Sequence, residues 1–205
     1  MLPLISALAL STNPSGSVWN PSDKSGNIGL ADSNRRAQWT SSGAVRGTQG
    51  RSSGLLYFEI AVVKGTLTTI GIGVAKSSYG LGGTSLGHSD SNSAGYDVIS
   101  GSGTRSAIST DFALAQPSYG AGDSVGVALD FSGYTGGVGC FFSKNGSWLG
   151  DSPGTPGGGP GSPFALSAPG MLFPCAAANS SSIELLLITN VPFLHPIPSG
   201  WSAWG

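Results

Sequence analysis

Charged residues are scarce in this 205-residue chain, at 9% of the sequence. Nine Lys and Arg residues against ten Asp and Glu residues give a formal net charge of −1 and no basic stripe. Nucleic-acid binding depends on clustered positive charge, so we expect no nucleic-acid partner. The surface must instead be built from Ser, Thr, Asn and Gly. Because net charge helps to keep proteins apart, this composition favours a chain that is oligomeric or assembled in a larger particle.

Cysteine and long apolar runs are also scarce. Cys140 and Cys175 are too few for a disulfide framework and lack the paired spacing of a zinc site, so we expect buried free thiols. No run approaches the roughly 20 apolar residues of a membrane span. The apolar start, Met1 to Ser11, has no preceding Lys or Arg and is short for a signal peptide. We therefore expect no membrane insertion, synthesis in a cytoplasm, and an N-terminal arm (1–16) that is a candidate docking segment.

Residues that carry chemistry are few and poorly spaced for catalysis. Glu59 and Glu184 lie on separate segments, and no pair of carboxylates alternates along one strand as glycoside hydrolysis on a β-sandwich would favour. His88 lies near Asp90 among serines, but the strained Gly-x-Ser-x-Gly turn of a nucleophile is missing. One carboxylate and one amide, Asp90 and Asn92, do not make a calcium site. We expect no catalytic residue, no metal and no cofactor.

Hydrophobic residues recur with a period of two, which is typical of strands, and nowhere convincingly with the period of a helix. Residues 55–63 are apolar on both faces except at Glu59, which predicts a central strand. In residues 66–75, Ile and Val alternate with Thr and Gly. Because only Lys64-Gly65 separates the two segments, we expect them to form a hairpin.

Three further segments complete the strand pattern. Residues 123–149 predict a meander of three strands that turns at Asn145-Gly146, a pair that tolerates the positive φ of a tight hairpin turn. Residues 171–178 and 182–190 predict two more strands. Strands at short spacing with Gly and Ser between them favour a single all-β sandwich over residues 17–205. A Pro/Gly-rich loop, 150–163, cannot lie inside a strand or helix.

The order of the short motifs resembles that of the SPRY family. The motifs are SSGLLYFEI, GIGVA, AGYD, GAGDSVGVALDF, CFFSKNGSW and LFPCAAA, within roughly residues 18 to 190. The resemblance implies a bent sandwich of two antiparallel sheets, the concanavalin-like jelly roll, and a non-catalytic role in which loops at one rim bind a partner. Two departures are Ser93-Ala94, where many relatives have an aromatic residue, and the long insertion after Trp148.

The segment VWNPSDKSGNIGLADSNRRAQWT is similar to the Trp-Asn-Pro-x-Asp-Lys opening of SPRY domains in phage proteins. This similarity predicts a non-enzymatic virion protein, made in the host cytoplasm, that decorates the capsid or belongs to the tail or fibre. Its loops 76–95 and 147–170 would bind other virion proteins or a host surface glycan or protein. Two alternatives stay open, a lectin-like or glycoside-hydrolase protein and an intracellular peptide-binding adaptor.

Five loop residues are the candidate binding residues. Tyr79, Tyr134 and Trp148 lie beside Gly-rich turns and are expected to be exposed, whereas His88 and Asp90 could make polar contacts. Near the end of the chain, we expect His195 to be a packed residue. Trp201 and Trp204 are expected to pack onto the sandwich or onto a neighbouring subunit.

Overall fold

The structure is a computed structural model. It describes residues 16–65, 69–87, 91–99, 102–107, 110–134, 137–149, 164–167 and 170–205. Nearly all of the predicted arm, the Pro/Gly-rich loop, His88 and Asp90 lie outside these ranges. In the described ranges the regular elements are β-strands, and no helix there is long and apolar enough to cross a membrane.

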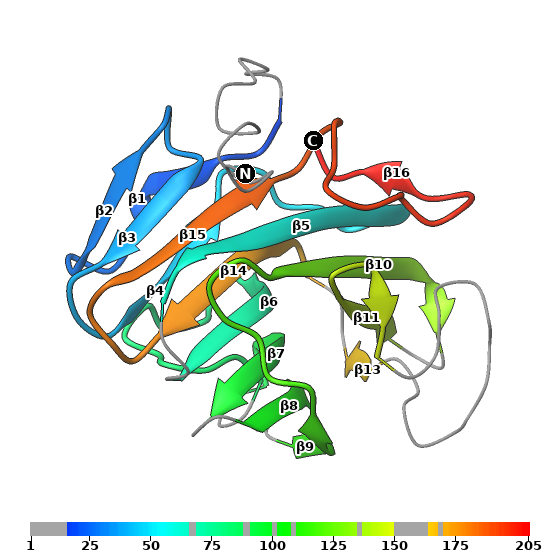
Figure 1. Cartoon of the computed structure of the whole chain (residues 1–205). Helices are drawn as coiled ribbons and strands as arrows, with labels where there is room; N and C mark the ends of the chain where they lie inside the picture. Colours follow the sequence, from blue (N-terminus) through cyan, green and yellow to red (C-terminus); the bar gives the residue numbers. More distant parts are fainter. Residues whose placement is uncertain are drawn as a thin grey trace.

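The strands form two antiparallel sheets (Figure 1), as the sequence predicted. Sheet A has the order β1 (Trp19–Lys24), β4 (Gly43–Gly47), β14 (Leu172–Ala178), β6 (Ile70–Lys76), β7 (Ser93–Ile99), β8 (Ser102–Ala107) and β9 (Thr110–Gln116). Sheet B has the order β12 (Ser147–Trp148), β11 (Gly137–Lys144), β10 (Ser124–Tyr134), β5 (Leu55–Lys64), β15 (Ile183–Ile188), β3 (Arg36–Trp39) and β2 (Ile28–Ala31). Two short strands extend sheet B: β13 (Phe164–Ser167) pairs with β11, and β16 (Ser202–Ala203) pairs with β5.

The core lies between the sheets and is filled by alternate residues of each strand. On β5 the inward side chains are Phe58, Ile60 and Val62, all fully buried. Each such side chain stabilises the fold by roughly 1.5 to 3 kcal/mol through apolar burial. The intervening residues Tyr57 and Glu59 are buried as well, so the outer face of sheet B must also be covered.

The hairpin expected between residues 55–63 and 66–75 is wrong. Strand β5 pairs with β10 and β15 in sheet B, whereas β6 pairs with β14 and β7 in sheet A. The chain crosses from one sheet to the other after Gly65, whose φ is +154°. Each is a central strand of its own sheet. A period of two reveals that a segment is a strand but not which strand it pairs with.

The meander predicted over residues 123–149 is confirmed. Strands β10 and β11 pair antiparallel, and β11 then pairs with β12. Asn145 and Gly146 have φ values of 50° and 78°, so both turn residues adopt the left-handed conformation that a tight hairpin turn requires.

The segment after β15, residues 190–205, is here called the C-terminal strap. Its middle part covers the outer face of sheet B, and its end, β16, pairs in parallel with β5 (red in Figure 1). Trp204 is fully buried, packs edge-on against Phe58 at 5.4 Å between ring centroids, and donates its Nε1 hydrogen bond to the carbonyl of Gln49 at 2.9 Å. Trp201 packs against Phe141 at 5.8 Å. Both tryptophans therefore pack onto their own sandwich.

Candidate functional site

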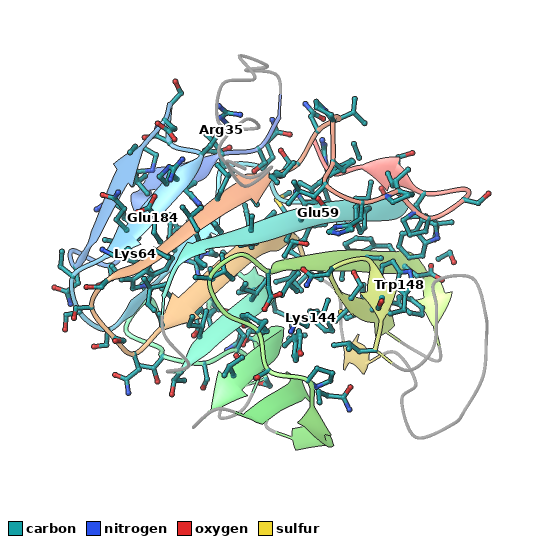
Figure 2. The ribbon with its side chains drawn as sticks, viewed as in Figure 1. Arg35, Glu59, Lys64, Lys144, Trp148 and Glu184 are labelled. Atoms are coloured by element: carbon teal, nitrogen blue, oxygen red, sulfur yellow. The ribbon has the colours of Figure 1, made fainter. Side chains whose placement is uncertain are left out.

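The strap divides the outer face of sheet B into a buried layer and a partly exposed one. The buried side chains are Tyr57, Ala128 and Phe141 of the sheet and Trp201 of the strap itself. The partly exposed side chains around them are Leu55, Trp148, Phe193 and Ile197, and this exposed group is here called the strap face. Figure 2 shows Trp148 at this end of sheet B, with Lys144 on β11 and Glu59 on β5.

Trp148 owes its position to the hairpin before it. The turn at Asn145-Gly146 brings β12 back beside β11, with Trp148 opposite Ser143. The indole then packs edge-on against Tyr57, with 6.3 Å between ring centroids and 63° between the planes. Trp148 remains half-buried, so part of a large apolar ring is available to a partner.

Glu59 holds the strap in place from below. Its carboxylate is fully buried and accepts hydrogen bonds from the Tyr57 hydroxyl at 2.7 Å and from the backbone N–H groups of Leu194 at 2.7 Å and His195 at 3.1 Å. Burial, reinforced by the Glu59 charge, raises the pKa of Tyr57, so the phenol stays protonated and donates. A buried carboxylate is tolerated because it is surrounded by donors.

His195 completes a serine, histidine and glutamate contact that does not have the geometry of a catalytic triad. Its Nδ1 lies 3.1 Å from Glu59 Oε1 and 3.2 Å from Ser124 Oγ. In a triad the serine contacts one ring nitrogen of the histidine and the acid contacts the other. When the histidine takes the serine proton, the acid stabilises the positive charge that forms on the ring. Here both meet the same nitrogen. The cluster therefore acts as a latch for the strap, not as a nucleophile with its base.

One residue of the sequence is a weak signal for this latch. A glutamate in an otherwise apolar strand must find partners if the strand is buried, and Glu59 was the exception in residues 55–63. His195 was expected to be a packed residue, but its contact with Glu59 spans 136 positions of sequence. No local pattern reveals a contact at that separation.

Polar contacts hold the start of β10 in place. Asp123 accepts hydrogen bonds from Asn145 Nδ2 at 2.7 Å and from the Gly120 backbone N–H at 3.0 Å, and it forms an ion pair with Lys144 at 3.3 Å. Burial alone would raise the pKa of Asp123, but these donors outweigh it and hold the pKa below its usual value.

Comparison with known proteins identifies the fold family. The model of the SPRY domain matches residues 55–189. The chain belongs to the SPRY family. SPRY domains usually serve as protein–protein interaction modules and are generally non-catalytic. No curated protein matches this sequence significantly.

Solved SPRY structures share the fold. The SPRY domain of human HERC1 superposes with a TM-score of 0.63 at 17% identity, over 85% of this chain and 99% of that one. The TRIM65 PSpry domain gives 0.61 at 12% identity, over 85% and 93%. A human SPRY domain gives 0.56 at 21% identity, over 82% and 98%. At such identities the similarity extends to the fold alone.

Tyr79 is not the exposed contact residue that the sequence predicted. Only 6% of it is accessible, and its hydroxyl donates to the Ser85 carbonyl at 2.8 Å. The outer face of sheet A in this SPRY domain carries small residues such as Gly71 and Ala75, which leave room for Tyr79 and Leu86 to pack down on it. A position beside glycines therefore did not mean exposure.

Arg46 fixes the same loop, residues 77–87. Its guanidinium forms a bidentate pair with Asp23, both contacts at 2.7 Å, and donates to the carbonyls of Tyr79 at 2.7 Å and Lys76 at 3.2 Å. The predicted binding loop 76–95 is thus folded back onto its own sheet over its described part. Asp23 of the Trp-Asn-Pro-Ser-Asp-Lys segment has a structural role in this SPRY domain.

The remaining candidates are divided by position. Trp148 is half-buried on the strap face. Tyr134 ends β10, and the structure describes its backbone but not its side chain. His88 and Asp90 lie outside the described residues, as does most of loop 147–170. The structure brings Trp148 together with Tyr57 and with Phe193 and Ile197 of the strap, which the sequence had not grouped with it.

Both cysteines are buried free thiols, as expected. Burial raises the pKa of the Cys140 thiol. Among the described residues, no group of three or more His, Cys, Asp or Glu side chains could hold a metal ion.

Proposed function

We propose that this SPRY domain is a non-catalytic recognition module that binds a protein partner through the strap face. The observation that carries the proposal is the group of partly exposed apolar side chains, Trp148 and Phe193 among them, set over buried aromatics. Aromatic side chains held in place by their own domain contribute most of the energy at protein interfaces. Pre-packing against Tyr57 lowers the entropy that Trp148 loses on binding.

We propose a virion as the setting, with another virion protein or a host surface component as the partner. The support is the Trp-Asn-Pro-Ser-Asp-Lys segment and a chain with a net charge of −1 and 9% charged residues, whose surface suits an assembled particle. An intracellular adaptor would use the same kind of face and is the second setting. Mass spectrometry of purified particles separates the two, because a virion component is present at a fixed ratio to the capsid protein.

A photo-crosslinking residue at Leu55 tests the strap face in producing cells. Leu55 borders Trp148, whereas exposed Thr40 lies just beyond β3 at another part of sheet B and serves as the matched control. The expected result is one dominant covalent adduct from position 55 and none from position 40. With Trp148→Ala added, the partner should bind roughly thirtyfold more weakly, because loss of a hot spot of about 2 kcal/mol changes the affinity by that factor. Less of the adduct should therefore form. Equal adducts from both positions, or no effect of Trp148→Ala, would overturn the proposal.

A further inference from the structure

A second surface feature lies where the strap leaves β15. It is a hollow lined by Gly16, Ser17, Val18, Arg35 and residues 186–192. One wall is apolar, because Ile188 faces the outer side of sheet B and is followed by Val191 and Pro192. Val191 is 62% accessible, more than any other large hydrophobic side chain in the described part of the chain. Pro192 beside it is exposed as well, so apolar surface is accessible at this wall of the hollow.

The chain enters the described structure inside this hollow. Gly16 is both the first described residue and part of the lining. Its position is fixed, since the Thr189 hydroxyl donates to the Ser17 carbonyl at 2.8 Å and the Gly205 backbone N–H donates to the Thr189 carbonyl at 3.1 Å. Residues 1–15 are therefore tethered at the edge of the apolar wall.

The sequence of the tethered segment matches the wall in character. The first ten residues, MLPLISALAL, are apolar except for one serine and carry no charged side chain. The next five, STNPS, are polar and supply a short linker to Gly16. A short tether gives an effective concentration in the millimolar range, so modest apolar contact suffices to favour docking within one molecule.

We propose that the hollow is the docking site for this chain's own N-terminal arm, residues 1–15, whose apolar side chains cover Ile188, Val191 and Pro192. The arm thus docks on the same domain to which it is attached. A second copy of the chain would have to bring an arm at bulk concentration into competition with the tethered one, so docking within one molecule is favoured.

Thiol labelling of Val191→Cys tests coverage of the wall. Cys140 and Cys175 are fully buried, so the introduced thiol is the accessible one among the described residues. Deleting residues 1–14 should speed its reaction with a maleimide by about tenfold, as expected when docking is favoured by a factor of ten. Lys64→Cys, exposed elsewhere on sheet B, is the control and should react at one rate with or without the arm. An unchanged rate at Val191→Cys would overturn the proposal.

Disulfide trapping shows which molecule supplies the arm. Leu4→Cys, Ala7→Cys and Leu10→Cys are each combined with Val191→Cys and oxidised at several protein concentrations. The expected product is a monomer with an internal disulfide in at least one combination, formed at a rate independent of concentration. The same arm variants combined with Lys64→Cys should form disulfides far more slowly. Disulfide-linked dimers whose rate rises with concentration, or equal trapping at position 64, would contradict docking within one molecule.

Discussion

At the scale of single residues, Glu59 shows how one buried charge joins distant parts of the chain. Its carboxylate accepts from the Tyr57 hydroxyl and from two consecutive backbone N–H groups of the strap. Water cannot replace the carboxylate without opening the strap, because Glu59 has no accessible surface. A donor left buried without an acceptor costs about 1 to 3 kcal/mol.

Glu59→Ala is expected to lower the free energy of unfolding by roughly 3 to 5 kcal/mol, because it leaves the Tyr57 hydroxyl and the strap N–H groups without their acceptor, at about 1 to 3 kcal/mol for each buried donor. Urea unfolding followed by tryptophan fluorescence measures the loss. The matched control is Glu184→Ala on β15, whose side chain is 17% accessible and pairs with Arg36. That change should cost about 1 kcal/mol or less. Similar losses in both variants would show that Glu59 is not the anchor of the strap.

Two buried tryptophans offer a matched comparison. Trp19 and Trp204 are both fully buried, but Trp204 Nε1 donates to the Gln49 carbonyl, whereas Trp19 Nε1 has no hydrogen-bond partner among the described residues. Trp204→Phe should therefore destabilise the protein by about 1 to 2 kcal/mol more than Trp19→Phe, which removes an unsatisfied donor. Thermal unfolding of the two variants in parallel gives the difference. The reverse order would mean that ring packing, and not the indole N–H, dominates.

At the scale of elements, local chemistry specified the β10–β11 hairpin well. The two turn residues and the alternation of apolar side chains are readable within a few positions, and the hairpin formed as predicted. The crossover between β5 and β6 was not readable, because both segments carry the same strand signal whether they pair or separate. The strand itself is a local property; its partner is not.

Asp123, at the start of this hairpin, should make the free energy of unfolding depend on pH in the acid range. Asp123 has a pKa below its usual value in the folded protein, because donors from Asn145, Gly120 and Lys144 outweigh its burial. Its stabilising contribution is therefore complete above the unfolded pKa of about 3.9 and is lost as the pH falls through the lower, folded value.

Asp123→Asn checks this sign. The free energy of unfolding of the variant should be lower than that of the parent by a constant amount above about pH 5, and the gap should narrow as the pH falls below about 4. Urea titrations at a series of pH values measure the gap. Asp130→Asn at the other end of β10 is the control, since the Asp130 side chain, within the described part of the chain, hydrogen-bonds to Ser132 in its own turn. A gap that stays constant down to pH 2 would contradict the assignment.

At the scale of the whole molecule, the strap is part of the domain although it lies beyond the family match. The SPRY match ends at residue 189, yet residues 190–205 supply Trp204 to the core and His195 to the Glu59 latch. The strap also carries Phe193 and Ile197 of the proposed binding face. Stability and recognition therefore depend on the same segment.

Deletion of residues 191–205 is expected to abolish cooperative thermal unfolding, because it removes a fully buried tryptophan and uncovers the outer face of sheet B. Deletion of residues 1–14, a segment of similar length, should leave a cooperative transition at a slightly lower temperature. Circular dichroism and calorimetry on the two variants measure this. A strap deletion that melts cooperatively near the temperature of the parent would show that the SPRY core folds without the strap.

The sequence by itself determined the strand class, the Asn145-Gly146 turn and the burial of both cysteines, because each depends on residue type and spacing within a short window. Only the tertiary structure decided that β5 and β6 belong to different sheets, that Tyr79 is buried, and that Glu59 meets His195. These outcomes depend on which distant segments pack together. In the latch, for example, Glu59 and His195 are separated by 136 positions of sequence. Packing of that kind is set by the whole core, so no local pattern encodes it.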